Sequence, residues 1–111
     1  MKQIKDTGAQ GDVFFCRVDS IPDTARRVEA TSGRHIVAHS ETGHHHWIAA
    51  DGRVEFYQQD DFTCYLRVDA FADVVHARPF DTHETMRLPA GSWLVRRQRE
   101  YTPEGYRRVE D

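Results

Sequence analysis

Seven histidines in a chain of 111 residues are the feature of this sequence with the clearest chemical potential. Three of them are consecutive, His44, His45 and His46, and they follow Gly43 inside the chain, which argues against a purification tag. On an extended segment, His44 and His46 project to one face about 7 Å apart, whereas His45 projects to the other. Neutral imidazole suits Zn, Fe, Ni or Cu. The segment therefore predicts one half of a divalent transition-metal site, with zinc as the first choice.

The remaining ligands have to come from other parts of the chain, because a catalytic metal site usually has three protein ligands and one open position. His76 and His83, which flank a loop containing Pro79, are the candidates. The carboxylates of Glu84 and Glu41 are candidate proton carriers for a water molecule that the ion would activate. Further options for ligands are Asp81 and His39.

Two other interpretations of the histidines stay open. The cluster can be an exposed, polar strand end beside a core residue, Trp47. It can also be a pH-responsive or substrate-binding group, because histidine titrates near neutral pH. His35 is interpreted as an ordinary polar residue outside the site.

Length and composition predict one small domain over residues 1–111, with residues 1–10 as a flexible N-terminal segment. The net charge of −3 argues against a protein that mainly neutralises phosphates. No window approaches the roughly 18 consecutive apolar residues of a membrane span, so we expect no membrane contact and a cytoplasmic location. Cys16 and Cys64 form no CxxC motif, and we expect them to be reduced and in the core.

A period of two dominates the sequence, which is the period of β-strands. Strands are expected at residues 12–18, 34–39, 44–49, 53–57, 63–68, 73–77, 84–88 and 92–101. Asp51-Gly52 predicts a type I′ turn that closes a hairpin between 44–49 and 53–57, and Pro89-Ala90-Gly91 predicts another turn. No segment shows a sustained 3.6-residue period. About eight short strands therefore predict an all-β fold with little helix, a small β-barrel or sandwich.

Four motifs follow one another along the chain, at residues 11–13 (GDV), 39–46 (HSETGHHH), 83–91 (HETMRLPAG) and 97–103 (RQREYTP). In this order they resemble a group of small uncharacterised bacterial and phage-borne proteins with the patterns GDV, GExTGHxH, HxEH followed by Leu-Pro-x-Gly, and QREYxP. The resemblance implies that His44, His46 and His83 act together. Phe80 stands where the group has a further histidine, so His76 takes that place if the intervening loop is an insertion.

A GxHxH pair on one strand and a later histidine also form the metal site of cupin-like β-barrels. The segment Gly43 to His46 is similar to that pattern in geometry, although it lacks the residue between the glycine and the first histidine. This second resemblance implies a metal-binding barrel.

The C-terminal region combines arginines with aromatic residues, namely Arg96, Arg97, Arg99, Arg107, Arg108, Trp93, Tyr101 and Tyr106. Guanidinium groups and aromatic rings together can bind single-stranded nucleic acid. Glu100 and Glu104 interrupt the basic patch, which favours a salt-bridged strand and tail over nucleic-acid contact. A protein interface is the third option.

Two functional hypotheses follow. In the first, His44, His46, His83 and His76 hold a divalent ion in a small metal-binding β protein, which would act as a hydrolase-like enzyme on a small molecule that the sequence does not name. In the second, the protein is a non-enzymatic interaction module of phage origin with a protein or nucleic-acid partner. A homodimer stays open under both hypotheses.

Overall fold

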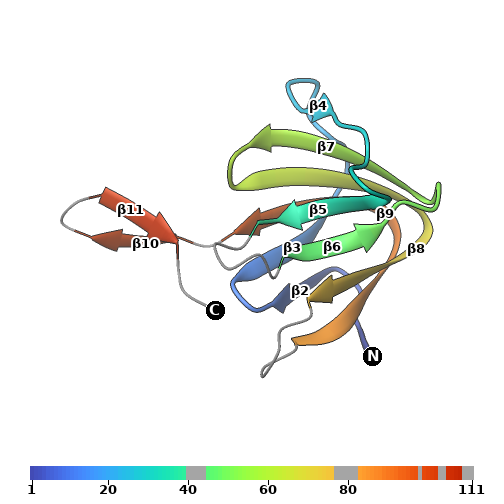
Figure 1. Cartoon of the computed structure of the whole chain (residues 1–111), viewed down its shortest axis with the longest axis horizontal. Coiled ribbons are helices and arrows are strands. Elements are labelled where there is room, and N and C mark those ends of the chain that lie inside the picture. The colour runs from blue at the N-terminus through green and yellow to red at the C-terminus, as the bar shows by residue number, and fades with distance from the viewer. Residues whose placement is uncertain (40–44, 77–82, 98, 103–104, 109–111) are drawn as a thin grey trace.

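The computed structural model describes residues 1–39, 45–76, 83–97, 99–102 and 105–108, and for residues 83, 99–102 and 105–108 it describes the backbone alone. The fold is all-β, as predicted (Figure 1). The strands are β1 Lys2–Gln3, β2 Thr7–Gln10, β3 Val13–Val18, β4 Arg26–Arg27, β5 Arg34–Ala38, β6 His46–Ala49, β7 Val54–Asp60, β8 Thr63–His76, β9 His83–Arg97, β10 Arg99–Thr102 and β11 Gly105–Arg108. The described residues contain no helix that is long and apolar enough to cross a membrane.

The main sheet is built around β8 and β9, its two longest strands, with 14 and 15 residues. They pair with each other from one end to the other in antiparallel orientation. On its other edge, β8 pairs first with β7 and then, nearer its end, with β6. The other edge of β9 pairs with β1 and then with β3. The two halves of the β8–β9 pair are therefore flanked by different strands.

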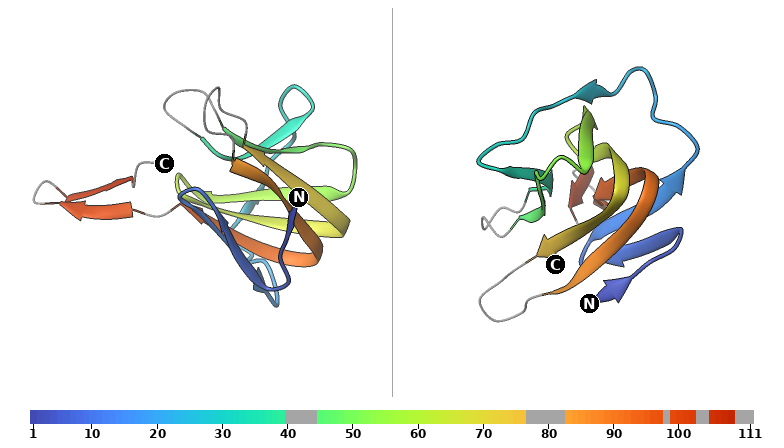
Figure 2. Two further views of the ribbon diagram at one scale, coloured as in Figure 1. Left: turned by 90° about the horizontal axis from the view of Figure 1, so that it is seen from below. Right: turned by 90° about the vertical axis from the view of Figure 1, so that its right-hand side faces the viewer.

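The sheet is strongly curved but does not close into a barrel (Figure 2). Its strand order is β2-β3-β9-β8-β6-β5, with β7 and β4 beside the first half of β8. Among the described residues, no ladder joins β2 to β5 at the two ends of this order. The barrel alternative is therefore wrong, because the sheet covers its core by bending rather than by closing its hydrogen bonds.

The bend in β9 occurs at the segment where a turn between strands was predicted. The ladder continues on both sides of Pro89-Ala90-Gly91, with a shift of register, so the prediction of a turn is wrong. The carbonyl of Pro89 accepts a hydrogen bond from Nε1 of Trp93 at 3.0 Å, and that of Ala90 accepts one from Nη1 of Arg17 at 2.8 Å. Gly91 has a φ of 138°, which a residue with a side chain rarely adopts.

The predicted hairpin at Asp51-Gly52 is also wrong. β6 pairs with β5 and β8, whereas β7 pairs with β4 and β8, so the connection leads from one half of β8 to the other. The tight hairpin instead joins β7 to β8, where Asp60 pairs with Thr63 and its Oδ1 accepts from the N–H of Phe62 at 2.8 Å. The type I′ signal concerns the local backbone only, and the pairing of each strand is decided by contacts with β8.

The core lies between the two halves of the bent sheet and consists mainly of aliphatic and aromatic side chains. Its most deeply buried hydrophobic members are Val13, Phe15, Ile48, Cys64, Leu66, Val74, Met86, Leu88, Trp93 and Val95. Both cysteines are free: Cys64 is buried, and Cys16 is half-buried on β3. Burial raises the pKa of the Cys64 thiol, which keeps it protonated.

Both ends of the chain contain short strands. Within the first ten residues, which were expected to be flexible, β1 pairs in parallel with β9 and β2 pairs with β3. At the other end, β10 and β11 form a separate two-stranded sheet in which Tyr101 is opposite Tyr106 (Figure 1).

The two tryptophans provide a test of this core. Trp93 is 0% exposed, whereas Trp47 is half-buried beneath the guanidinium of Arg34, 4.0 Å from its ring centroid. We expect Trp93→Ala to lower the free energy of unfolding by about 3–5 kcal/mol, because it leaves a large cavity. Trp47→Ala should cost less than half as much. Urea denaturation followed by circular dichroism measures both, and equal losses would contradict the placement of Trp93.

Candidate functional site

Two of the predicted metal ligands, His46 and His76, lie together in the interior of the protein. His46 is the first residue of β6, and His76 is the last residue of β8. Trp47 pairs with Val75, so the antiparallel register brings the two histidines together at the ends of neighbouring strands. Their ring centroids are 3.7 Å apart with an interplanar angle of 22°, and the residues are 0% and 1% exposed. They form a buried imidazole pair.

The histidine next in sequence has a different environment. His45 is half-buried, and its ring meets the exposed His39 edge-on with a centroid distance of 4.9 Å. The separation of His45 from buried His46 agrees with strand alternation. The predicted ligand His44 and the predicted proton carrier Glu41 lie outside the described residues.

His83 is the first residue of β9 and pairs with His76 in the ladder between β8 and β9. The structure describes only the backbone of His83. On the other side, His46 of β6 is opposite Ala38 of β5. Backbone register thus places three of the predicted histidines, one on each of β6, β8 and β9, at the same end of the sheet.

A glutamine that the sequence gave no reason to select binds His46. Oε1 of Gln10, the last residue of β2, lies 2.8 Å from Nδ1 of His46. The amide nitrogen of the same side chain donates to the carbonyl oxygens of Val74 and Glu84, each at 2.9 Å. Two residues of β9 face one residue of β8 at this position, so the amide bridges both strands at a β-bulge.

The carboxylate of Glu84, a predicted proton carrier, lies at the surface. Its Oε2 forms an ion pair with the N-terminal ammonium group of Met1 at 3.0 Å, and its side chain is 59% exposed. The backbone carbonyl of the same residue binds Gln10. Glu84 therefore adjoins the histidine site through its backbone and contacts the N-terminus through its side chain.

Two imidazoles alone form an incomplete metal site. Within the part of the chain that the structure describes with side chains, no three His, Cys, Asp or Glu residues form a group that could hold a metal ion. The only two predicted ligands whose side chains the described residues bring into contact are His46 and His76.

His35 is the third buried histidine and differs from the pair. It is 8% exposed and stacks on Phe56 with a centroid distance of 5.6 Å, so its interpretation as an ordinary polar residue missed its place in the core. Burial lowers the pKa of His35, Glu29 opposes this effect by its charge, and Arg27 adds to it. The side chain of His35 therefore packs in the core as an uncharged ring.

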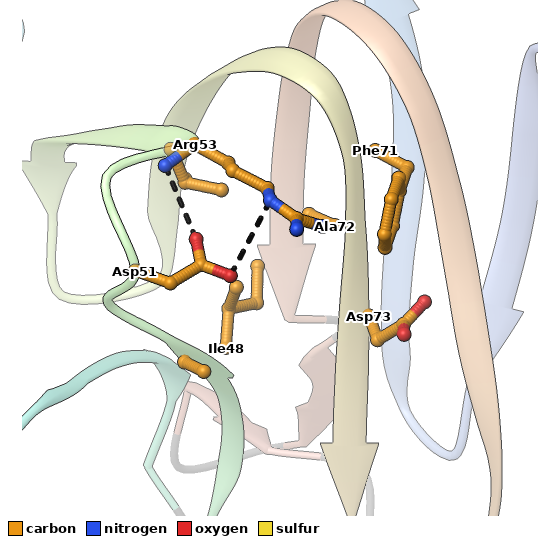
Figure 3. A pocket seen from close by; sticks show the side chains of 8 residues that line it. Ile48, Asp51, Arg53, Phe71, Ala72 and Asp73 are labelled. Atoms are coloured by element: carbon orange, nitrogen blue, oxygen red, sulfur yellow. Dashed lines mark hydrogen bonds and ion pairs between the residues drawn. The ribbon is translucent and has the colours of Figure 1, made fainter.

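A small pocket beside β6 and β8 carries charged groups that bind one another (Figure 3). The guanidinium of Arg53 lies 3.6 Å from the carboxylate of Asp51 and 4.4 Å from the ring centroid of Phe71. Asp73, which also lines the pocket, forms two hydrogen bonds with Arg87, at 2.8 and 3.0 Å. The pair of Asp73 and Arg87 joins β8 to β9, and none of the described residues that line the pocket is a histidine.

The described residues form one bent sheet of nine strands, with a buried histidine pair at one end, and a separate sheet of two strands. The chain belongs to the family described as a domain of unknown function, DUF8820, whose model matches residues 9–98. The matched region contains Gln10, His46, His76 and His83, and it ends before β10. No curated protein and no solved structure matches the chain.

The lowered pKa of His35 predicts how the free energy of unfolding changes with pH. As the pH falls below about 6.5, the unfolded chain takes up a proton that folded His35 does not, so this residue reduces the free energy of unfolding. His35→Phe removes that contribution. We expect the stability of the natural protein minus that of the variant to decrease between roughly pH 7 and pH 5, by at most about 1.4 kcal/mol per pH unit. Urea denaturation at several pH values measures it, and a difference that grows toward low pH would contradict it.

Proposed function

We propose that this protein binds one divalent transition-metal ion, preferably zinc, through His46, His76 and further histidines of the chain. The observation that carries the proposal is the stacked, fully buried pair of imidazoles. Two nitrogens bound to one tetrahedral zinc ion are about 3.4 Å apart, since each zinc–nitrogen bond measures about 2.1 Å. The lone pair of an imidazole nitrogen lies in the plane of its ring, so these stacked rings, whose centroids are 3.7 Å apart, would have to move apart to bind one ion.

The surroundings of the pair support a ligand role. A buried polar ring needs partners for its nitrogens, and Gln10 provides one for Nδ1 of His46. Neighbouring interior positions are apolar, among them Ile48, Val74 and Met86. Two adjacent histidines among apolar neighbours favour a ligand role for the pair over a purely structural one.

His83 and His44 are the proposed remaining ligands. The backbone of His83 lies opposite that of His76, and His44 precedes His46 by two positions, the spacing of residues that share a strand face. With three or four neutral imidazoles, the site would favour zinc, nickel, copper or iron over magnesium and calcium, which prefer oxygen ligands.

Metal analysis of purified, untagged protein tests the proposal. We expect about one zinc ion per chain, and a melting temperature that rises on the order of 10 °C when free zinc exceeds its dissociation constant about a hundredfold. Less than about 0.2 ion per chain, together with no change in melting temperature on adding zinc or a chelator, would show that the protein is not a metal-binding protein.

Substitutions locate the site. His46→Asn and His76→Asn should each abolish stoichiometric zinc binding. His35→Asn is the matched control, because it also replaces a buried histidine, but one that stacks on Phe56. We expect this control to retain zinc binding. If the variants of the pair do not fold, zinc-induced shifts of the His46 and His76 ring signals in NMR spectra of the natural protein provide the same test, and unchanged signals would exclude this site.

A further inference from the structure

The hydrogen bonds of Gln10 indicate which ring nitrogen of His46 carries a hydrogen, which the stacking of the two histidines does not. Gln10 is 4% exposed, and all the polar atoms of its side chain have partners inside the protein. The Nε2 atom has two hydrogens, and it donates one to the carbonyl of Val74 and one to that of Glu84. The Oε1 atom faces Nδ1 of His46.

The two carbonyls determine the orientation of this amide. A rotated amide would direct Oε1 at two carbonyl oxygens, which leaves three acceptors in contact without a hydrogen, and buried acceptors without donors are costly. Only the orientation with Nε2 toward Val74 and Glu84 provides donors for both. Gln10 therefore presents an acceptor, and not a donor, to His46.

An amide oxygen can only accept a hydrogen bond, so the hydrogen between Gln10 and His46 belongs to the imidazole. At 2.8 Å from Oε1, Nδ1 of His46 carries that hydrogen. In a neutral imidazole with a hydrogen on Nδ1, the lone pair that can bind a metal ion is on Nε2.

We propose that Gln10 is a positioning residue that holds His46 in the tautomer with its hydrogen on Nδ1, so that Nε2 is the nitrogen that binds the metal ion. The second part of this inference rests on the proposed metal-binding function, whereas the first part concerns the metal-free protein. Histidine ligands of metals almost always donate their other ring N–H to an oxygen acceptor, which orients the ring. Oε1 of Gln10 is such an acceptor for the Nδ1–H group of His46.

The β-bulge anchors Gln10, because the carbonyls of Val74 and Glu84 there accept hydrogen bonds from its amide. Gln10 is 36 residues from His46 in sequence, and its amide is held by the two strands, β8 and β9, that carry His76 and His83. The side chain of Gln10 thus connects the ring of His46 to the backbone of β8 and β9. The tautomer of His46 becomes a consequence of the assembled sheet.

The first experiment measures the tautomer in the natural, metal-free protein above neutral pH. A two-dimensional ¹H–¹⁵N correlation of the imidazole rings distinguishes the nitrogen that carries hydrogen from the one with the lone pair. We expect the hydrogen of His46 on Nδ1. A hydrogen on Nε2 would overturn the role of Gln10, and this measurement needs no variant.

The second experiment compares Gln10→Met with Gln58→Met. Methionine is similar to glutamine in size but offers His46 no comparable acceptor. Gln58 is the matched control, because its Nε2 also donates to two backbone carbonyls, those of Asp60 and Thr63, in the hairpin between β7 and β8. We expect Gln10→Met to mix the tautomers of His46 and to weaken zinc binding by about 10–100-fold, while Gln58→Met changes neither.

The outcomes separate this inference from the proposed function. A hydrogen on Nδ1 in a protein that does not bind zinc would support the positioning role and overturn the metal-binding function. Tight zinc binding with the hydrogen of His46 on Nε2 would support the function and overturn the role of Gln10. Equal effects of the two glutamine variants on zinc binding would also overturn it, since they would reflect loss of sheet stability.

Discussion

The antiparallel pairing of β8 with β9 organises the whole main sheet. These strands pair from Thr63 opposite Arg96 to His76 opposite His83, which is long enough for each half to have different neighbours. Their bend brings the two halves over a common core. The carbonyl groups freed at the bend of β9 bind side chains of Arg17 and Trp93, so the bend is part of the hydrogen-bonded structure.

The candidate site lies at the far end of this central pair. His76 and His83 occupy it because the two strands end and begin there, and β6 adds His46 because it pairs with the second half of β8. Gln10 joins from β2, at one end of the strand order. Formation of the site therefore requires most of the sheet to be assembled, and a metal ion bound there would stabilise the same arrangement.

Much of the local structure could be predicted from the sequence. The strands at 12–18 and 34–39 correspond to β3 and β5, because alternation of apolar side chains is a local property of each segment. The partners could not be predicted in this way. The Asp51-Gly52 signal pointed to a hairpin, and Pro89-Ala90-Gly91 pointed to a turn, yet long-range contacts of β8 and β9 decided both.

Local patterns in the chain were enough to predict the all-β class, the strand alternation that separates His45 from His46, and the histidines to consider. The contacts of the folded chain were needed to find that His46 stacks on His76, that His35 belongs to the core and that Oε1 of Gln10 lies beside Nδ1 of His46. This difference arises because periodicity depends on neighbours in the chain. Burial and hydrogen bonding depend instead on residues that are distant in sequence, which a bent sheet brings together.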